Sequence, residues 1–280
     1  MGSISQSTRA ELHFLDPAVH ATPEAEKLYF VSGRPTPGKP QTNQVFIPRT
    51  VEIHNARFDR DSFNLKEHSF EWAYVPINNH DLSTATGREE YLRYTEDFLK
   101  KHLGASRVHA YDHVLREQRD PGMPRTDGFE KSKRTVLTTH CDISQTCAQN
   151  RVKEYFPDPE EENLYQGRWQ IVNVWRPLVD VVESHPLAVC DAKTVCREDL
   201  TPSDMIYPTH TTEIYHLFHN PGQKWYYLDA QTKDEVLLLK NFDSDLSTAC
   251  AHTAFVDPAT PPTAKGRKSV EVRCWVFYAD

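Results

Sequence analysis

The sequence predicts a mainly β protein with helical support, whose core is a double-stranded β-helix, the jelly-roll barrel of cupins. Strand-like segments dominate the second half of the chain, one amphipathic helix stands out in the first half, and strands do not alternate with helices as in a parallel α/β sheet. Many antiparallel strands favour two facing sheets. We therefore expect the core over residues 131–280, with residues 1–130 as an N-terminal α/β extension packing on it within a single structural unit.

The first half contributes an arm and a helix. Residues 16–50 hold many Pro, Gly, Thr and Asn between short apolar pieces, which predicts an irregular arm with one strand pair. Residues 87–103 place Tyr91, Tyr94 and Phe98 three and four positions apart, and Gly104 comes next as a stop signal. This spacing predicts an amphipathic helix.

The second half is rich in β signals. Segments of β-branched and aromatic residues predict strands at residues 135–142, 170–175, 213–218, 225–228, 235–240 and 269–278, with a short helix at 144–156. Residues 157–166 and 193–210 make the chain longer than a minimal barrel needs, so we expect both to leave the core, where they can form a lid. Cover for an active site should come from the N-terminal half or from a second subunit in a homodimer.

Composition narrows the function classes. The chain has 280 residues, and 32 Lys and Arg against 40 Asp and Glu give a net charge of −8 without a basic block. A nucleic-acid partner is therefore not expected, and a small-molecule substrate is favoured. The sequence has neither an apolar leader nor a long apolar run, so we expect a cytoplasmic protein without a membrane partner. Its six cysteines form no Cys-X-X-Cys pair, which favours buried apolar roles over metal or disulfide roles.

The first candidate site lies in the predicted strand at 135–142. Alternation along a strand projects His140 and Asp142 from one face and Cys141 from the other. A distant histidine would complete a facial triad of two histidines and one carboxylate, which leaves three positions open on an octahedral iron. The candidates for that third ligand are His185, His210, His216, His219 and His252. His252 is preferred because only this histidine has an Arg-X-Ser motif at a workable distance after it.

Arg267 and Ser269 form that motif and share one face of the last predicted strand. Arg267 comes 15 residues after His252 (267 − 252). A guanidinium fork and a hydroxyl at this spacing suit a carboxylate, such as the distal end of 2-oxoglutarate. In isolation, a surface arginine paired with Glu271 would be the simpler interpretation. The order His-X-Asp, distant His, Arg-X-Ser favours the cosubstrate role instead.

These residues resemble the Fe(II)/2-oxoglutarate-dependent dioxygenases. The segments 172–178, 186–192, 225–227 and 242–244 are similar to the mostly fungal hydroxylase/desaturase group, also described as cephamycin 7α-methoxylase-like, and the resemblance runs from about residue 57 to the end. It implies an iron enzyme that takes 2-oxoglutarate as cosubstrate with O2, releases succinate and CO2, and hydroxylates, desaturates, cyclises or forms a peroxide in a secondary metabolite. The metal ligands it implies are His140, Asp142 and His252.

Four further residues are candidate contacts for cosubstrate or substrate. Asn173, Trp175 and Arg176 lie in one strand-like apolar run, where a buried arginine needs an anionic partner, either a ligand or a structural carboxylate such as Asp191. Arg151 lies on the predicted short helix and can face the metal strand or solvent. Because Arg267 is the one cation placed in the site and is assigned to the cosubstrate, we expect a neutral or weakly polar substrate. A small amino acid held by Arg176 or Arg151 is the alternative.

Two other classes of protein stay open on the sequence. One is a jelly-roll metalloenzyme that does not use 2-oxoglutarate, either an iron oxidase of the isopenicillin-synthase type or a cupin with another metal. The other is a non-catalytic binding barrel in which His140 and Asp142 are ordinary strand residues. The polar residues Asp112, His113 and Arg116 are expected to form a surface network.

Overall fold

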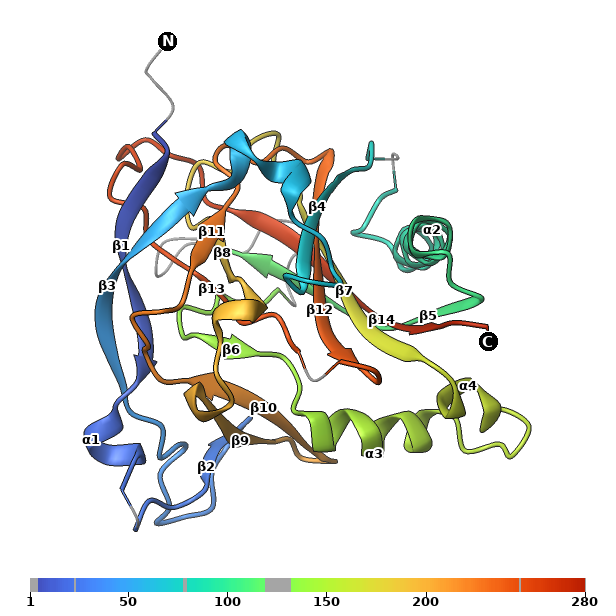
Figure 1. Ribbon diagram of the computed structural model, residues 1–280, viewed down its shortest axis with the longest axis horizontal. Helices are drawn as coiled ribbons and strands as arrows, with labels where there is room; N and C mark the ends of the chain where they lie inside the picture. Colours follow the sequence, from blue (N-terminus) through green and yellow to red (C-terminus); the bar gives the residue numbers. More distant parts are fainter. Residues whose placement is uncertain (1–4, 23, 78–79, 119–131, 247, 280) are drawn as a thin grey trace.

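The computed structural model describes residues 5–22, 24–77, 80–118, 132–246 and 248–279. Two curled β-sheets face each other (Figure 1), and strands far outnumber helices in sequence coverage. The predicted mainly β, jelly-roll class is therefore confirmed. The domain boundary expected after residue 130 falls outside the described ranges and stays a prediction.

The larger sheet has nine strands in the order β1-β3-β11-β8-β13-β6-β10-β9-β2. Its central members β13, β6 and β10 each carry a histidine. The strands are β1 (Ser7–Leu15), β2 (Leu28–Val31), β3 (Phe46–Asn55), β6 (His140–Cys141), β8 (Leu187–Cys190), β9 (Leu200–Ile206), β10 (Thr211–Leu217), β11 (Trp225–Tyr227) and β13 (His252–Ala254).

The smaller sheet has five strands in the order β4-β12-β7-β14-β5. These are β4 (Phe70–Tyr74), β5 (Arg107–Glu117), β7 (Trp169–Pro177), β12 (Glu235–Asp243) and β14 (Lys268–Phe277), all antiparallel to their neighbours. A bulge between Lys240 and Phe242 interrupts the pairing of β12 with β7. The bulge adds Asn241 on β12 opposite a single step of the partner strand.

Alternation assigns each face of the five-stranded sheet to a different core. On the inner face Trp175, Leu237 and Leu239 pack in one cluster with Leu187 and Val189 of the larger sheet. On the outer face Val172, Val174 and their neighbours pack against Tyr91 and Leu99 of helix α2 (Ala85–Leu103). Strand β7 is buried along its whole length because both of its faces are covered.

Three helices besides α2 are short: α1 (Pro17–His20), α3 (Gln145–Tyr155) and α4 (Asn163–Gln166). Helix α2 matches the predicted amphipathic helix, and Gly104 ends it in the left-handed conformation at φ 65°. Helix α3 begins after Ser144, whose side chain accepts a hydrogen bond from the backbone N–H of Cys147. It lies across one end of the space between the sheets (Figure 1).

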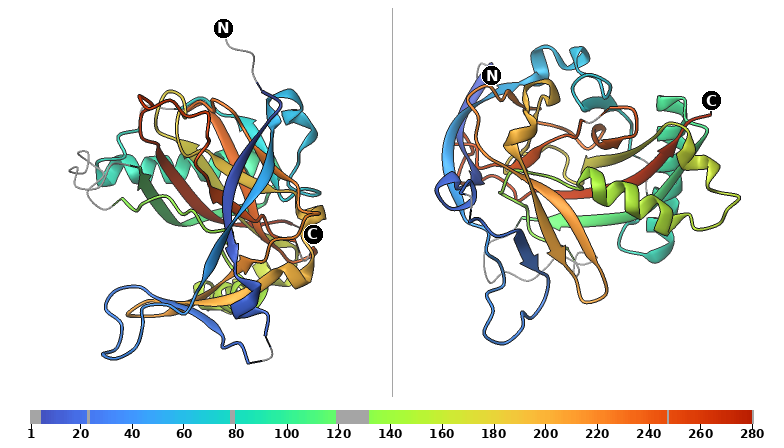
Figure 2. Two further views of the ribbon diagram at one scale, coloured as in Figure 1. Left: turned by 90° about the vertical axis from the view of Figure 1, so that its left-hand side faces the viewer. Right: turned by 60° about the horizontal axis from the view of Figure 1, so that its bottom comes forward.

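Two peripheral segments contribute strands to the sheets. The expectation that residues 193–210 leave the core is wrong for residues 200–206, because β9 pairs with β10 over its full length and extends the larger sheet. Residues before 130 supply strands to both sheets: β1, β2 and β3 belong to the larger sheet, and β4 and β5 to the smaller. Figure 2 shows the long β1–β3 ladder twisting down towards the end formed by β2, β9 and β10.

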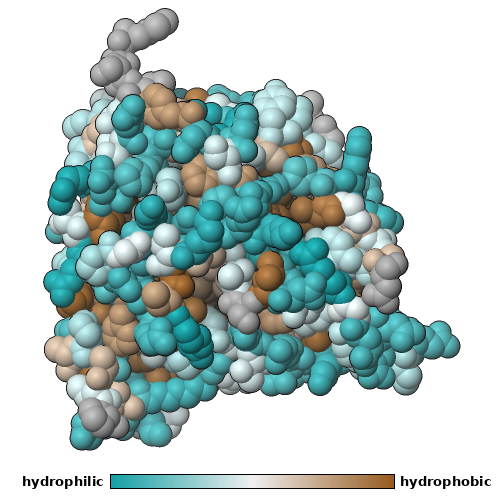
Figure 3. Space-filling view, in the orientation of Figure 1, coloured by the Kyte–Doolittle hydropathy of each residue, from teal (hydrophilic) through white to brown (hydrophobic). Residues whose placement is uncertain are grey.

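The surface is mostly hydrophilic on the face seen in Figure 3, with hydrophobic residues in small separate patches. Four of the six cysteines are buried and none of the six forms a disulfide, consistent with the apolar roles expected of them. Within the described residues, no helix is long and apolar enough to span a lipid bilayer.

Candidate metal centre and cosubstrate pocket

Three histidines lie in a row across the centre of the larger sheet. His140 on β6 is in register with His252 on β13 on one side and with His216 on β10 on the other. Residues directly opposite each other on paired strands share a face, so all three rings point to the interior between the sheets. The ring centroids of His140 and His252 are 4.4 Å apart, and those of His140 and His216 are 6.4 Å apart.

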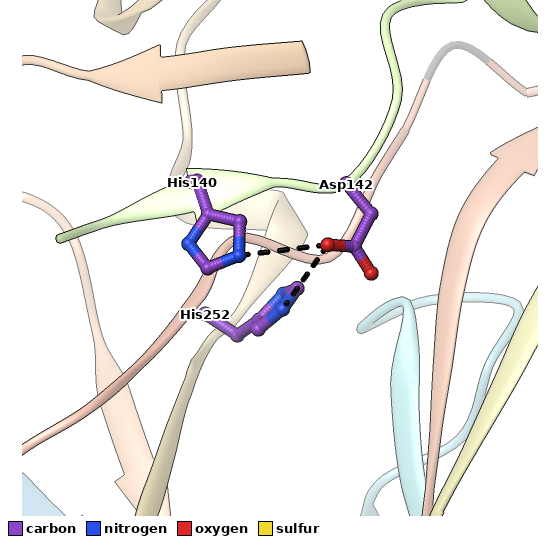
Figure 4. A group of neighbouring side chains, drawn as sticks. All are labelled: His140, Asp142 and His252. Atoms are coloured by element: carbon purple, nitrogen blue, oxygen red, sulfur yellow. Dashed lines mark ion pairs between the residues drawn. The ribbon is translucent and has the colours of Figure 1, made fainter. Parts of the chain in front are cut away.

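Asp142 lies close to two of these histidines. Its Oδ1 lies 3.5 Å from His140 Nε2 and 3.8 Å from His252 Nε2 (Figure 4). Ligand atoms of these three residues all lie within 4.8 Å of one another, and among the described residues this is the group of His, Cys, Asp and Glu able to hold a metal ion. The predicted preference for His252 over His216 agrees with this geometry.

Backbone contacts orient both imidazoles. The Nδ1 atom of His140 lies 2.8 Å from the carbonyl of Thr138, and that of His252 lies 3.1 Å from the carbonyl of Cys250. An N–H at Nδ1 donating to a carbonyl leaves Nε2 as a lone-pair ligand. Both Nε2 atoms then face Asp142, as a metal between the three residues requires.

Protonation states in the site suit a divalent cation. Burial raises the pKa of Asp142, but the charges of Arg273 and His252 and a hydrogen bond with His140 outweigh it and hold that pKa well below its usual range. Burial, followed by the neighbouring His140, lowers the pKa of His252 to about 4. The centre therefore offers an ionised carboxylate and a neutral imidazole at neutral pH, which are the forms that bind metals.

A network behind Asp142 was not predicted. The side-chain N–H groups of Asn173 donate to Asp142 Oδ2 at 2.6 Å and to Glu271 Oε1 at 2.8 Å. Arg273 lies 3.8 Å from Asp142 and 3.6 Å from Glu271. Strand alternation was the missed signal, because Glu271 and Arg273 continue the inward face begun by Arg267 and Ser269 on the last strand.

Arg267 lies next to the metal centre and is buried, not on the surface. Its side chain is 1% exposed and lines a narrow cavity together with His140, His252 and Trp175. The Nη1 of Arg267 donates to the carbonyl of His185 at 2.6 Å. The Nε of Arg267 and the hydroxyl of Ser269 have no hydrogen-bond partner among the described residues. Unpaired buried donors at this position fit a ligand that carries a carboxylate.

A second cavity, of about 780 Å³, also reaches the metal centre and is lined there by His140 and Asp142. Arg151, Asn173 and His216 line it, and so do residues of the N-terminal arm such as Phe30 and Phe46. The expected cover from the N-terminal half is therefore present. Asn241 also lines this cavity, and both polar atoms of its buried side chain have no partner among the described residues.

Arg176 has a different place from the other candidates. It projects from β7 to the outer face, where Nε donates to the hydroxyl of Tyr91 at 2.9 Å and Nη1 donates to the carbonyls of Val75 and Lys233. It lines neither cavity. The structural role is the one its geometry supports, with Tyr91 in place of the expected Asp191.

The polar residues of β5 also differ from expectation. Asp112 and Arg116 line the large cavity and are not merely a surface network, and Arg116 lines the narrow cavity as well. The remaining histidine candidates lie apart from the metal group: His210 stacks on Tyr207 at the cavity wall, and His219 packs against Phe14.

Comparison with known proteins agrees with this geometry. A family model described as oxidoreductase/YMDC permease-like domain matches residues 12–277. The Fe(II)/2-oxoglutarate-dependent dioxygenase nvfI of Aspergillus novofumigatus is 34% identical over 263 residues, covering 90% of this chain and 91% of that protein. The hydroxylase/desaturase CTB9 of Cercospora beticola is 32% identical over 257 residues, covering 83% and 77% of the two chains.

A solved structure shares the whole fold. The iron and alpha-ketoglutarate-dependent endoperoxidase NvfI superposes with a TM-score of 0.84 at 30% identity, covering 98% of this chain and 99% of that one. Fold, site and relatives define a non-haem iron dioxygenase. The chain belongs to the oxidoreductase/YMDC permease-like family, within the fungal hydroxylase/desaturase group of Fe(II)/2-oxoglutarate-dependent dioxygenases.

Proposed function

We propose that the protein oxidises a small organic molecule with O2 and 2-oxoglutarate, at an iron held by His140, Asp142 and His252. The observation that supports this proposal is that a candidate metal site and a buried cation lie next to each other. Three ligand atoms lie within 4.8 Å of one another, and the unsatisfied donors of Arg267 and Ser269 lie in the adjoining narrow cavity. A bound Fe(II) would supply the activation of dioxygen, chemistry that no side chain provides.

The protein's own residues prepare that chemistry. The carbonyls of Thr138 and Cys250 fix the imidazole rings, and Asn173 holds the carboxylate of Asp142 through a 2.6 Å hydrogen bond. Outer contacts of this kind hold ligands in one geometry and raise metal affinity. Three protein ligands leave open positions for cosubstrate and oxygen.

Arg267 and Ser269 suit the distal carboxylate of 2-oxoglutarate. The guanidinium also lies 5.3 Å from the ring centre of Trp175, a cation–π contact that restricts its position. A dicarboxylate that reaches from the metal to Arg267 would pair the buried cation and satisfy both orphaned donors. This accounts for a cation that is otherwise costly to bury.

The substrate would occupy the large cavity. Its volume of about 780 Å³ lies within the range of small-molecule sites. The relatives include enzymes named as hydroxylases, desaturases and an endoperoxidase, so the reaction proposed for this chain is oxidative tailoring of a secondary metabolite. A cytoplasmic location and a homodimer remain predictions from the sequence.

Succinate formation tests the proposal. Purified protein with Fe(II), 2-oxoglutarate and O2 should convert 2-oxoglutarate into succinate and CO2, slowly alone and faster with a substrate. A metalloenzyme that does not use 2-oxoglutarate would bind iron without forming succinate. A non-catalytic barrel would do neither, and that result would refute the proposal.

A further inference from the structure

The large cavity is more basic than the protein as a whole. Among the described residues, its lining contains four cationic side chains, Arg116, Lys133, Arg151 and Arg273, and two carboxylates, those of Asp112 and Asp142, while the chain carries a net charge of −8. Asp142 is one of the three candidate metal ligands. Among the described residues, the acids of this cavity are therefore fewer than its cations.

Ion pairing accounts for one of the four cations. Arg273 lies 3.1 Å from Asp112, and it also contacts Glu271 and Asp142. That pairing uses the carboxylate of Asp112. For Arg116, Lys133 and Arg151, no carboxylate lies within 4.0 Å among the residues that the structure describes.

Backbone pairing places Arg116 and Lys133 opposite each other. The two residues are bridge partners, and backbone bonds from Lys133 to Leu115 and from Glu117 to Lys133 fix their register. Like charges at two such bridged positions repel each other. Burial, followed by the charges of Arg116 and Arg273, also lowers the pKa of Lys133, while Asp112 and Glu271 act in the opposite direction. An anion between the two side chains would relieve the repulsion.

We propose that Arg116 and Lys133 bind an anionic group of the organic substrate, and that the substrate is an amphipathic organic acid. A carboxylate suits this pair because the guanidinium presents a fork and the ammonium adds a point charge. The apolar body would lie along walls formed by Phe30, Phe46 and Met205. This inference rests on the proposed function, because it names the substrate of the same site.

The expectation of a neutral substrate came from the net charge of the chain and from Arg267 being the one cation placed in the site. Net charge does not describe a cavity, whose few charged side chains sit close to the ligand. Cosubstrate is the competing anion, because Arg116 also lines the narrow cavity beside Arg267. Lys133 separates the two alternatives, since it lines the large cavity and not the narrow one.

A matched pair of fluorescent probes tests the charge preference without iron or cosubstrate. The anionic probe is 8-anilinonaphthalene-1-sulfonate, and N-phenyl-1-naphthylamine has the same rings without the sulfonate. Both are titrated into metal-free protein, its Arg116→Met and Lys133→Met variants, and a Lys153→Met control. Lys153 is an exposed cation of α3 that does not line the cavity. Lys153→Met changes the net charge by the same amount as either cavity variant.

The wild-type protein should bind the sulfonate more tightly than the neutral probe, with an affinity that falls as salt rises. Each cavity variant should weaken sulfonate binding about two- to fivefold, the size expected of one partly exposed charge contact. Binding of the neutral probe should stay the same, which also shows that the variants fold. Equal binding of both probes to the wild type, or an equal loss in Lys153→Met, would overturn the proposal.

Two measurements on the loaded enzyme complete the test. Lys133→Met should leave the affinity for 2-oxoglutarate unchanged, and a loss as large as that for the sulfonate would assign these cations to cosubstrate instead. Matched pairs of organic acids and their methyl esters are then compared as triggers of succinate release, with the acids expected to be the stronger. If no succinate forms at all, the proposed function fails, while the probe result still decides the anion site.

Discussion

Replacing Arg267 by leucine should weaken 2-oxoglutarate binding far more than it affects the fold. The residue is 1% exposed, its guanidinium has no carboxylate within 4.0 Å among the described residues, and one of its hydrogen bonds goes to the carbonyl of His185. Burial, followed by the charge of Arg116, lowers the pKa of Arg267 to about 9. The side chain is thus a buried cation without an ionic partner among the described residues, and we propose that 2-oxoglutarate supplies that partner.

The size of the effect comes from that burial. Removing one side of a buried, hydrogen-bonded charge pair costs about 2–5 kcal/mol. At about 1.4 kcal/mol per decade, Arg267→Leu should lower cosubstrate affinity roughly thirtyfold to several thousandfold. Ser269→Ala removes one neutral donor to a charged acceptor and should cost about 1.5–3 kcal/mol. Arg267→Lys keeps the charge without the fork and should fall between wild type and leucine.

The assay is titration of 2-oxoglutarate into anaerobic, iron-loaded protein, followed by the metal-to-ligand charge-transfer band. A second readout is the free energy of unfolding of the metal-free protein. There Arg267→Leu should be neutral or stabilising, because a buried charge without an ionic partner is removed. Unchanged affinity in Arg267→Leu would refute the assignment. A large loss of stability in the metal-free variant would show that Arg267 is chiefly structural.

Three further predictions concern neighbouring side chains. Asn241→Leu removes a buried amide without a partner among the described residues, so chemical denaturation should show a free energy of unfolding that is unchanged or higher by about 1–3 kcal/mol. Substrate-stimulated succinate release should fall, and unchanged release would contradict a role of Asn241 in the cavity. Asn173→Ala removes the donor to Asp142 and should weaken iron binding about 10- to 100-fold in chelator competition, and full affinity would show that the bond is dispensable. The metal-free protein should lose stability as pH falls from about 6.5 to 4. Burial lowers the pKa of His216 and His252 to about 4, so as the pH falls the unfolded state binds these protons before the folded state does. Each histidine should therefore reduce the free energy of unfolding by about 3 kcal/mol over this range. A flat profile in pH-dependent denaturation would contradict this.

Local periodicity was enough to place most of the site. The spacing of His140 and Asp142 set both on one face, although regular pairing in the structure covers only His140–Cys141. The predicted strand at 135–142 is shorter than expected because other residues of this segment join the fold through an isolated bridge between His13 and Thr138. The two side chains still share a face because this needs only a short extended segment.

The alternation of side chains along β7 could also have predicted which face of the strand Arg176 occupies. Asn173 and Trp175 share one face of this strand, and Arg176 has the opposite parity, which places it under helix α2. The three residues were expected to act as one set of contacts because they lie in one apolar run. Their parity along the strand is enough to separate Arg176 from the cavity.

Other features depend on tertiary structure that no local pattern encodes. Asn241 faces the cavity because a bulge shifts β12 against β7, and a bulge leaves no fixed spacing in a sequence. The pairing of β9 with β10 joins residues that looked like an insertion to the larger sheet. Arg116 reaches the cavity because β5 lies at the edge of the smaller sheet, next to β14. Sheet order of this kind is set by long-range packing.

Iron binding by two matched histidine variants tests the central claim most directly. His252 and His216 flank His140 in register on either side, and both are buried, so each replacement by alanine removes an equivalent ring. Anaerobic titration with Fe(II) should give about one iron per chain in the wild type. His216→Ala should keep that stoichiometry and His252→Ala should lose it. Iron retained by His252→Ala and lost by His216→Ala would contradict the proposed metal centre.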